Sequence, residues 1–328
     1  MRLLLLGGTE FAGPPLVHEA LARGWRVTVF NRGRSPAPPG VTALRGDRLA
    51  PGGLAALADG TWDLVVDTWS EAPVAVQATA RLLAGRAGHY SYLSSRSVYA
   101  FPPPAGANED SPVVAGAPDA ERTEYAADKR GGELAAQREF GVDRALLVRC
   151  GLLLGPYENV GRLPWWLRRI ARGGEVLAPG PAELPLQYLD IRDLARWTLD
   201  AAARGLTGPY DLVSPPGAST MGELLTACAA VTGSAATFRW LTPEAVLAAG
   251  IEPWTELPCW LPPGPLHAGL HGSDVSRALA AGLTVRPVAE TVRDTWRWLG
   301  ELPPGTRLGG LRSPIGLPEE KEARALAG

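Results

Sequence analysis

The sequence predicts an α/β fold, in which a doubly wound parallel sheet is followed by a smaller C-terminal lobe. Short apolar runs alternate with helical patterns over residues 1–150, as they do in βαβ units. Within these runs apolar and polar residues do not alternate, which is typical of parallel strands buried on both faces. After Gly151 prolines, glycines and tryptophans become frequent and strand signals become sparse. We therefore assign residues 1–155 to the sheet domain and 156–328 to the lobe, with segments around 185–215 returning to the sheet.

Six strands and three helices are expected in the sheet domain. The strands are Arg2–Leu6, Arg26–Phe30, Val41–Leu44, Leu64–Asp67, Tyr90–Ser94 and Ala145–Arg149, and the helices are Pro14–Arg23, Val74–Ala84 and Ala120–Phe140. Prolines suit the first turn of the first helix, and Gly24 provides a left-handed stop. In the lobe, Thr220 and Glu223 have the capping-box spacing that opens a helix. Leu257–His271 is expected to be a long loop, and Glu319–Ala327 a short charged helix.

Composition excludes several classes of function. The 46% apolar and 20% charged content is ordinary for a globular protein, and a net charge of −2 argues against a nucleic-acid partner. Met1–Leu6 is too short for a secretory signal, and no apolar stretch approaches the ~20 residues that span a membrane. The three cysteines are widely spaced and the histidines form no H-x-x-x-H pair. We expect a cytoplasmic protein without a metal, a membrane partner or a nucleic-acid partner.

A glycine-rich turn follows the first strand and opens the first helix. Its sequence is Gly7-Gly8-Thr9-Glu10-Phe11-Ala12-Gly13. Glycines here let backbone N–H groups approach a pyrophosphate, which a helix N-terminus favours electrostatically. The turn predicts a Rossmann-type dinucleotide site; the alternative is a strand-to-helix turn without a ligand. Glu10 weakens the motif, because a carboxylate near a pyrophosphate is unfavourable unless it points away.

The end of the second strand bears on the choice between NAD and NADP. NAD sites favour Asp or Glu there, as an acceptor for the ribose 2′-hydroxyl. This chain has Asn31-Arg32-Gly33-Arg34 instead, and arginines suit a 2′-phosphate by charge and by bidentate geometry. We therefore predict NADP as the preferred cofactor over NAD; the alternative is that the arginines are solvated loop residues. Asp47, after the third strand, is placed to bond an adenine amino group.

Tyr125 and Lys129 lie four residues apart within a predicted helix, so both side chains project from one face. A tyrosine hydroxyl has an unperturbed pKa near ~10, and an adjacent ammonium favours the phenolate and lowers that value. The chain has 7 tyrosines but only two lysines, the other basic residues being arginines. Roughly 0.04 such pairs are expected by chance. The spacing therefore predicts an acid/base pair rather than an exposed helix surface.

Ser94 ends the fifth predicted strand and Ser95 follows it directly, within the run Tyr92–Tyr99. Ligands bind at the carboxyl ends of strands in open parallel sheets. Ser95 is thus placed to hydrogen-bond a substrate oxygen and orient it toward Tyr125. A serine-rich turn without function is the alternative.

Together with Tyr188–Ala195, these motifs resemble the extended (or atypical) short-chain dehydrogenases/reductases, the NAD-dependent epimerase/dehydratase family, over residues 1 to about 300. The resemblance implies that Tyr125 is the acid/base, that Lys129 also holds the nicotinamide ribose, and that Ser95 completes the triad. It implies cofactor contacts at the glycine turn, at the end of the fourth strand and beside the nicotinamide: Gly7, Gly8, Thr9, Glu10, Phe11, Gly13, Asp67, Thr68, Ser94, Cys150 and Leu152. Homodimers are common among such proteins.

Arg96 and Ser97 mark a departure from the sugar-nucleotide dehydratases of this family, which carry an acidic pair after the catalytic hydroxyl residue. Dehydration by that route is therefore disfavoured. The form of the glycine turn also resembles a branch that includes chloroplast stem-loop RNA-binding proteins, so the fold need not be an enzyme. Candidate substrate contacts are Arg96, Arg162, Trp166 and Gln187. Trp165 and Trp166 at helical spacing also suit a core or an interface.

Three functions follow as hypotheses. The first is an NAD(P)-dependent oxidoreductase acting on a carbonyl or alcohol of a small metabolite, with Tyr125 moving the proton. The second is an epimerase that oxidises its substrate transiently. The third is a non-catalytic dinucleotide-sensing or RNA-binding protein, against which the complete triad and the lack of a lysine-rich patch both argue.

Overall fold

The computed structural model describes residues 1–303, 305–308 and 314–327. A parallel sheet of seven strands forms the centre of its sheet domain. The strand order is β10-β6-β5-β4-β1-β2-β3, and every neighbouring pair is parallel. The strands are β1 (Arg2–Leu6), β2 (Arg26–Asn31), β3 (Thr42–Arg45), β4 (Trp62–Asp67), β5 (Ala87–Ser95), β6 (Ala145–Cys150) and β10 (Gly208–Leu212). The predicted Rossmann-type fold with a smaller C-terminal lobe is confirmed.

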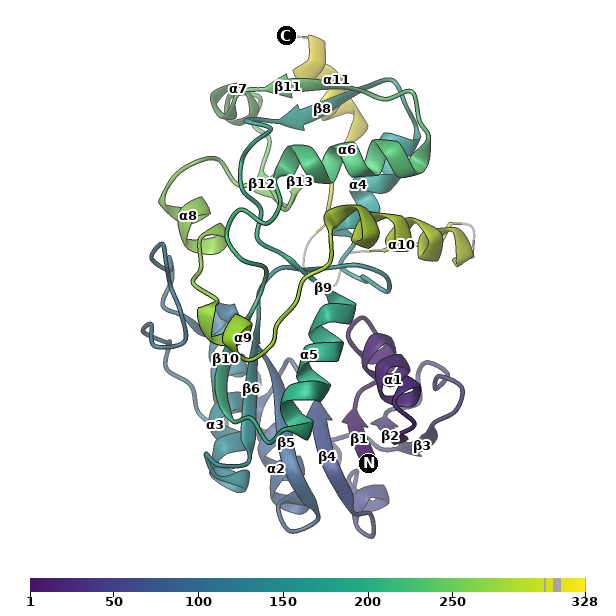
Figure 1. Ribbon diagram of the computed structural model, residues 1–328, viewed down its shortest axis with the longest axis vertical. Coiled ribbons are helices and arrows are strands. Elements are labelled where there is room, and N and C mark those ends of the chain that lie inside the picture. The colour runs from purple at the N-terminus through teal and green to yellow at the C-terminus, as the bar shows by residue number, and fades with distance from the viewer. Residues whose placement is uncertain (304, 309–313, 328) are drawn as a thin grey trace.

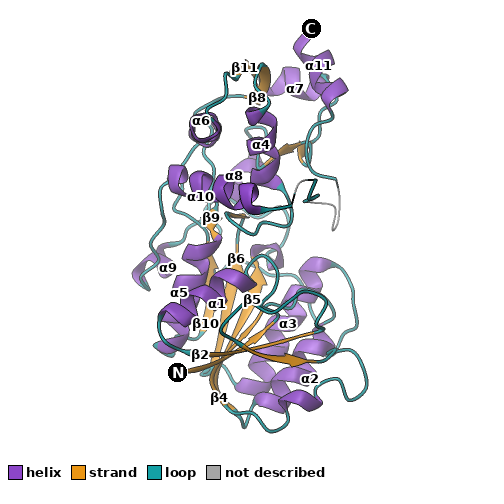
Figure 2. Cartoon of the chain, turned by 90° about the vertical axis from the view of Figure 1, so that its right-hand side faces the viewer, coloured by secondary structure: helices purple, strands orange, loops and turns teal. Residues whose placement is uncertain are grey.

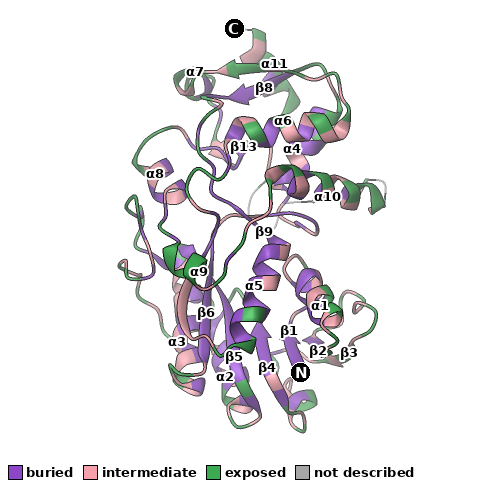
Figure 3. Cartoon of the chain, viewed as in Figure 1, coloured by how far each residue is buried: buried purple, intermediate pink, exposed green. Residues whose placement is uncertain are grey.

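Helices cover both faces of this sheet (Figure 2). On one face lie α1 (Gly13–Ala22) and α5 (Ile191–Ala203), and on the other lie α2 (Pro73–Leu83) and α3 (Tyr125–Phe140). Alternate residues of a strand point to opposite faces, so Leu3 and Leu5 pack in one core and Leu4 and Leu6 in the other. The central strands β1, β4, β5 and β6 are buried on both sides (Figure 3), which explains why β1, β4 and β6 read as apolar runs.

The C-terminal lobe has a core of its own, at the top of Figure 1, and includes the buried indoles of Trp166 and Trp260. Its elements are α4 (Arg162–Ala171), β8 (Glu175–Pro179), α6 (Met221–Thr232), β11 (Thr237–Leu241), α7 (Pro243–Ala248), β12 (Pro253–Trp254), β13 (Leu257–Pro258), α8 (Pro265–His271), α10 (Val288–Glu301) and α11 (Glu319–Ala327). The chain returns to the sheet through α5 and β10, and α9 (Ser276–Ala280) packs beside β10. The short strands β7 (Leu153–Leu154) and β9 (Leu189–Asp190) pair where the chain passes between the two parts. The described part of the chain also has the 3-10 turns η1 (Ala55–Leu57) and η2 (Arg96–Val98).

Two predicted elements differ from the structure. The helix expected over Ala120–Phe140 begins only at Tyr125, because Asp128 accepts the N–H of Thr123 at 2.8 Å and Ala120 accepts the N–H of Val74 at 3.0 Å. These bonds hold the preceding residues against α2 in a non-helical path. The loop expected over Leu257–His271 contains β13 and the helix α8, which begins at a Gly-Pro step.

Other local predictions are confirmed. Thr220 and Glu223 form the capping box of α6, with the Thr220 hydroxyl accepting the Glu223 N–H at 3.1 Å and the Glu223 carboxylate accepting the Thr220 N–H at 2.9 Å. Glu319–Ala327 is α11. Among the described residues, no helix combines the length and apolar character required to cross a bilayer.

The strand order places the candidate residues at one edge of the sheet. Successive strands run outward from β1 in both directions, toward β3 on one side and toward β10 on the other, so the order reverses between β1 and β4. Ligands of such sheets bind outside the carboxyl ends of the strands at this reversal. Gly7, Asn31, Thr68 and Ser95 all stand at or just after those ends.

Candidate active site

The turn between β1 and α1 requires its glycines. Gly7 and Gly8 have φ values of +119° and +95°, which favour glycine. A Cβ on Gly7 would lie 2.2 Å from the Thr68 Oγ1, and one on Gly13 would lie 2.4 Å from the Gly8 carbonyl carbon. The turn is therefore folded tightly onto itself at the N-terminus of α1, with no side chain at these positions to block a phosphate group.

The remaining turn residues take different positions. Thr9 is half-buried, and Phe11 has a φ of +37° and packs against the core beneath α1. Glu10 is exposed, and its carboxylate accepts a hydrogen bond from Asn159 Nδ2 at 3.4 Å. The carboxylate that departs from the expected motif thus contacts the chain that follows β7.

The ends of β2 and β3 meet beside this turn. Asn31 Nδ2 donates to the Gly7 carbonyl at 3.2 Å, and Asn31 Oδ1 accepts the Gly33 N–H at 2.8 Å. Arg32 and Arg34 are exposed. Arg45 also reaches this place, because it pairs with Asn31 in the β2–β3 register. No local sequence pattern marks Arg45 as a residue of this place, since only the pairing of β3 with β2 brings it there.

Asp47, Asp67 and Thr68 stand at further strand ends. The Asp47 carboxylate accepts the Leu49 N–H at 3.1 Å. The Thr68 hydroxyl donates to the Leu6 carbonyl at 2.9 Å and lies against Gly7. It therefore shapes the glycine turn.

Asp67 is fully buried, and both of its oxygens bind Arg48, at 2.7 and 2.8 Å. Burial alone would raise the pKa of Asp67, but the Arg48 guanidinium and the hydrogen bond from Tyr90 hold it below its usual value. The Asp67 carboxylate is thus bonded to Arg48, Tyr90 and the Trp69 N–H within the protein.

Lys129 is buried beneath the strand ends. Its Nζ donates to the Leu93 carbonyl at 2.6 Å and to the Trp69 carbonyl at 2.8 Å, and it lies 4.9 Å from the centre of the Tyr92 ring. Tyr125 is the first residue of α3, one helical turn before Lys129, and is half-buried. The ammonium group is therefore fixed against the strand that carries Ser95, and Tyr125 lies four residues earlier on the same helix.

Ser95 ends β5 and caps η2. Its Oγ accepts the Ser97 N–H and donates to the Ser97 Oγ, both at 3.1 Å. Across the sheet Ser95 pairs with Cys150, the last residue of β6. The hydroxyl therefore stands at the carboxyl edge of the sheet on a short, internally bonded turn.

Residues beside Ser95 form an apolar or neutral border. Ser94 Oγ is buried, with no hydrogen-bond partner within the described ranges. Burial raises the pKa of Cys150 to about 12, which the nearby Lys129 ammonium only partly opposes. Cys150 is consequently a neutral thiol and is not suited to act as a nucleophile. Leu152 is half-buried, and its carbonyl accepts the Leu189 N–H at 2.8 Å.

A network of buried charged and polar side chains joins α3 to the turn after Ser95. Glu133 accepts two hydrogen bonds from Arg149, at 2.9 and 3.1 Å, and Arg149 also donates to the Tyr99 hydroxyl at 3.1 Å. Tyr99 donates to Asp211 at 2.6 Å, and Asp211 binds Arg96 Nε at 3.3 Å. Burial raises the pKa of Asp211 to about 6, opposed by Arg96 and Tyr99. The network links the helix of Tyr125 and Lys129 to both ends of η2.

Three of the four candidate substrate residues are bonded inside the protein. Arg96 is buried, binds Asp211 and donates to the Leu270 carbonyl at 3.4 Å. Gln187 is fully buried, with its amide donating to the Ser214 and Ser273 carbonyls and accepting the Ser273 N–H. Trp166 lies in the core of the lobe and donates to the Pro258 carbonyl at 2.8 Å.

The fourth candidate, Arg162, does not share a surface with the buried Arg169 of the same helix, α4. Arg162 is half-buried over the Trp254 ring at 5.7 Å, whereas Arg169 is buried and pairs with Glu322 at 2.6 Å. Glu158 accepts the Arg162 N–H at 2.7 Å at the start of α4. Burial raises the pKa of this carboxyl to about 7.

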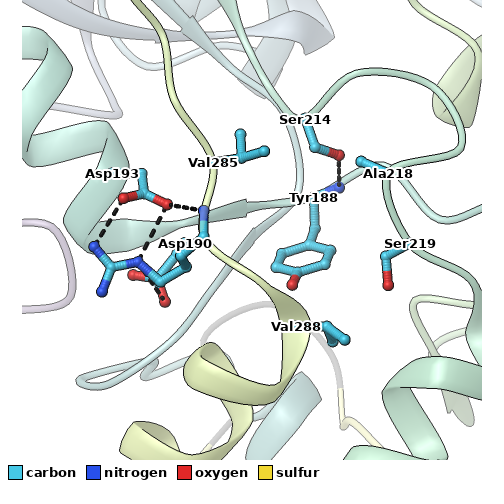
Figure 4. A pocket seen from close by; sticks show the side chains of 9 residues that line it. Tyr188, Asp190, Asp193, Ser214, Ala218, Ser219, Val285 and Val288 are labelled. Carbon is cyan, nitrogen blue, oxygen red and sulfur yellow. Dashed lines mark hydrogen bonds and ion pairs between the residues drawn. The ribbon is translucent and has the colours of Figure 1, made fainter.

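A small pocket lies between the segment before α5, the loop after β10 and the start of α10 (Figure 4). Its lining residues are Tyr188, Asp190, Asp193, Ser214, Ala218, Ser219, Val285, Arg286 and Val288. Arg286 binds Asp193 at 2.8 Å and lies 3.7 Å from Asp190, so both carboxylates are neutralised within the protein. Beside the pocket, Arg192 of α5 pairs with Asp294 of α10. Ion pairs around this pocket therefore join the lobe to the sheet domain.

Comparisons with known proteins bear on the family and the fold of the chain. A model of the NAD dependent epimerase/dehydratase family matches residues 3–211. The chain is 31% identical over 115 residues to a dTDP-glucose 4,6-dehydratase of Streptomyces niveus, a match that covers 34% of this chain and 32% of that protein. The chain thus spans about a third of that curated relative.

Solved structures of the same fold cover nearly the whole chain. The Bordetella bronchiseptica enzyme WbmH in complex with NAD+ has a TM-score of 0.67 and 19% identity, covering 92% of this chain and 98% of its own. UDP-glucuronic acid 4-epimerase from Bacillus cereus in complex with NAD has a TM-score of 0.65 and 15% identity, covering 92% and 99%. At these identities the likeness is one of fold.

Proposed function

We propose that this chain, which belongs to the NAD dependent epimerase/dehydratase family, is an NADP-preferring oxidoreductase acting on a carbonyl or alcohol group of a small metabolite. The observation that carries the proposal is the buried Lys129 ammonium, bonded to the Leu93 and Trp69 carbonyls one helical turn from Tyr125. Burying an ammonium is costly unless it is hydrogen-bonded, and buried titratable groups in such environments cluster at functional sites. Its position at the carboxyl edge of a Rossmann sheet supports a role in cofactor binding and proton transfer.

The residues present fit a dinucleotide. At Gly7 and Gly13 an added Cβ would meet neighbouring atoms at 2.2 and 2.4 Å, so the chain keeps side chains out of the place where a pyrophosphate would approach α1. We assign the pyrophosphate to this turn, the nicotinamide ribose to Lys129, and the adenosine side to the ends of β2 and β3. When bound, the nicotinamide accepts or supplies a hydride at the substrate carbon.

The protein's own contribution is proton transfer and orientation. The Tyr125 phenol would donate a proton to the substrate oxygen in reduction and remove it in oxidation, because the neighbouring Lys129 ammonium stabilises the phenolate electrostatically. The Ser95 hydroxyl would donate a hydrogen bond to the same oxygen as negative charge develops. The neutral Cys150 thiol and the half-buried Leu152 would border the reacting carbon without competing for protons.

Epimerisation by transient oxidation is the second candidate, and it would use the same residues. It is favoured by the 4-epimerases among the solved structures of this fold. Net consumption of NADPH separates the two, since an epimerase returns the hydride and turns over without it. Dehydration is not proposed, because Arg96 occupies the position after Ser95 and is itself paired with Asp211.

Fluorescence titration with NADPH and NADH tests the proposal, together with a Tyr125→Phe variant. We expect both coenzymes to bind, NADPH more tightly, and the variant to bind them as the wild type does. In assays over a panel of aldehydes and ketones, the variant should lose turnover on the order of 10²-fold or more. Tyr210→Phe is the matched control, because the Tyr210 ring contacts Trp197 at the outermost strand, β10.

Two results would contradict the proposal. A wild-type protein that binds neither coenzyme would exclude any nicotinamide-dependent activity. A Tyr125→Phe variant that keeps full turnover would show that the phenol does not transfer the proton, and would favour a non-catalytic or differently catalysed function.

A further inference from the structure

Three arginines gather at the carboxyl ends of β2 and β3. Arg32 and Arg34 follow β2, and Arg45 ends β3 directly opposite Asn31 in the strand register. All three side chains are exposed, and within the part of the chain that the structure describes none of them forms an ion pair. The protein as a whole has a net charge of −2, so this is a local concentration of positive charge that no ion pair among the described residues neutralises.

Contacts through Gly33 fix Arg45 relative to the glycine turn. Gly33 has a φ of +71°, and a Cβ there would lie 2.9 Å from Arg45 Nε and 3.0 Å from its Cδ. The Arg45 side chain therefore lies directly on the backbone of the β2 loop, in space that any larger residue at 33 would occupy. Gly33 in turn donates to Asn31 Oδ1, and Asn31 Nδ2 donates to the Gly7 carbonyl. A continuous set of contacts thus runs from the phosphate turn to the Arg45 guanidinium.

The chemistry of this set suits a phosphate monoester. An acidic residue at the end of β2 would accept hydrogen bonds from a ribose diol, but Asn31 stands there and its amide is engaged with the backbone on both sides. A phosphate monoester carries a charge of about −1.5 to −2 at neutral pH and offers three acceptor oxygens. Guanidinium groups match such an oxyanion in charge and in bidentate geometry.

We propose that Arg45 is a specificity-determining residue for the 2′-phosphate of NADP, which it contacts from the β3 side while Arg32 and Arg34 contact it from the β2 loop. This inference rests on the proposed function, since it assumes that a dinucleotide occupies the glycine turn. It adds a residue from a different strand to the cofactor site. It also explains why a residue without a side chain is needed at position 33, next to Arg45. Any side chain at 33 would displace the guanidinium.

Equilibrium titration of Arg45→Gln with NADPH and with NADH tests this inference. Removing a charge-assisted contact should weaken NADPH binding about tenfold or more, while NADH binding stays within about twofold of the wild type. Arg45→Lys, which keeps the charge but loses the planar fork, should fall between the two. Arg26→Gln is the matched control, because Arg26 is an exposed arginine at the opposite end of β2 and should leave both affinities unchanged.

Competition by 2′,5′-ADP and by 5′-AMP makes the test independent of the nicotinamide and of Tyr125. Arg45→Gln should reduce the affinity for 2′,5′-ADP and leave that for 5′-AMP unchanged. Equal weakening of NADPH and NADH, or an unchanged preference between them, would overturn the role of Arg45. If the wild-type protein binds NADH as tightly as NADPH, the three arginines do not bind a 2′-phosphate, and the oxidoreductase proposal is left intact. If it binds neither coenzyme, the proposed function itself is wrong.

Discussion

Replacing Arg149 with methionine removes the centre of the buried network behind the candidate active site. Arg149 is 3% exposed and donates four hydrogen bonds: two to the Glu133 carboxylate, one to the Tyr99 hydroxyl and one to the Glu109 carbonyl. Methionine retains much of the apolar volume of the side chain but none of these donors. Among the described residues, the fully buried Glu133 carboxylate would keep its hydrogen bond from Arg130, at 2.8 Å, and lose both hydrogen bonds from Arg149.

The expected cost follows from that remaining contact. Breaking a buried ion pair by removing one partner typically costs about 3–5 kcal/mol, because the other charge is left uncompensated. Since Arg130 still binds one Glu133 oxygen, we expect Arg149→Met to lower the free energy of unfolding by about 3 kcal/mol, the lower end of that range. Glu133 lies four residues beyond Lys129 on α3, so the loss falls on the helix that carries the proposed catalytic pair.

Urea denaturation at neutral pH, followed by tryptophan fluorescence, measures this cost. Arg138→Met, on the exposed face of the same helix, is the control and should change stability by less than about 0.5 kcal/mol. The double variant Glu133→Gln/Arg149→Met also removes the stranded charge and should cost less than the two single changes added together. A loss below about 1 kcal/mol for Arg149→Met, or strictly additive costs in the double variant, would refute the reasoning.

Two further predictions concern the lobe and the glycine turn. Burial raises the pKa of Glu158 to about 7, so the folded protein favours the protonated carboxyl. The contribution of this carboxyl to stability is fully present below its unfolded pKa near 4.5 and is lost as the pH rises through about 7. The change in the free energy of unfolding approaches about 3 kcal/mol. The difference in urea midpoint between the wild type and Glu158→Gln should therefore shift against the wild type from pH 4.5 to pH 8. Glu183→Gln, at an exposed position, is the matched control for the loss of one carboxyl group. A Cβ on Gly13 would lie 2.4 Å from the Gly8 carbonyl carbon, so Gly13→Ala should weaken NADPH and NADH alike by about tenfold or more, while Gly85→Ala, which meets open space, should bind both normally. Unchanged affinity in Gly13→Ala would show that the turn does not hold the cofactor.

The sequence predicted elements whose signals are local. The unbroken apolar runs of β1, β4 and β6 and the capping box at Thr220 depend on a few neighbouring residues, and the structure has them where they were expected. The sequence placed the start of α3 five residues too early, at Ala120 instead of Tyr125. The hydrogen bonds that keep the preceding residues out of the helix come partly from α2, about 50 residues earlier in the chain.

Side-chain environments that depend on strand order were not predictable in the same way. Asp67 was expected near the adenosine, but Arg48, from the segment after β3, reaches across to hold both of its oxygens. Arg45 and Arg149 are ordinary charged residues in the sequence. Arg45 meets Asn31 only through the pairing of β3 with β2, and Arg149 meets Glu133 and Tyr99 only because α3 and the residue after η2 pack against β6. By contrast, Tyr125 and Lys129 share one helix, so their spacing alone placed both on the same side of it.

A crystal structure of the protein with NADP+ bound is the most direct test of the central claim. We expect the pyrophosphate against Gly7, Gly8 and Gly13, the nicotinamide ribose at the Lys129 ammonium, and the Tyr125 hydroxyl facing the nicotinamide ring. A coenzyme bound elsewhere on the molecule, or a Tyr125 hydroxyl turned away from a ring that is correctly seated, would contradict the account.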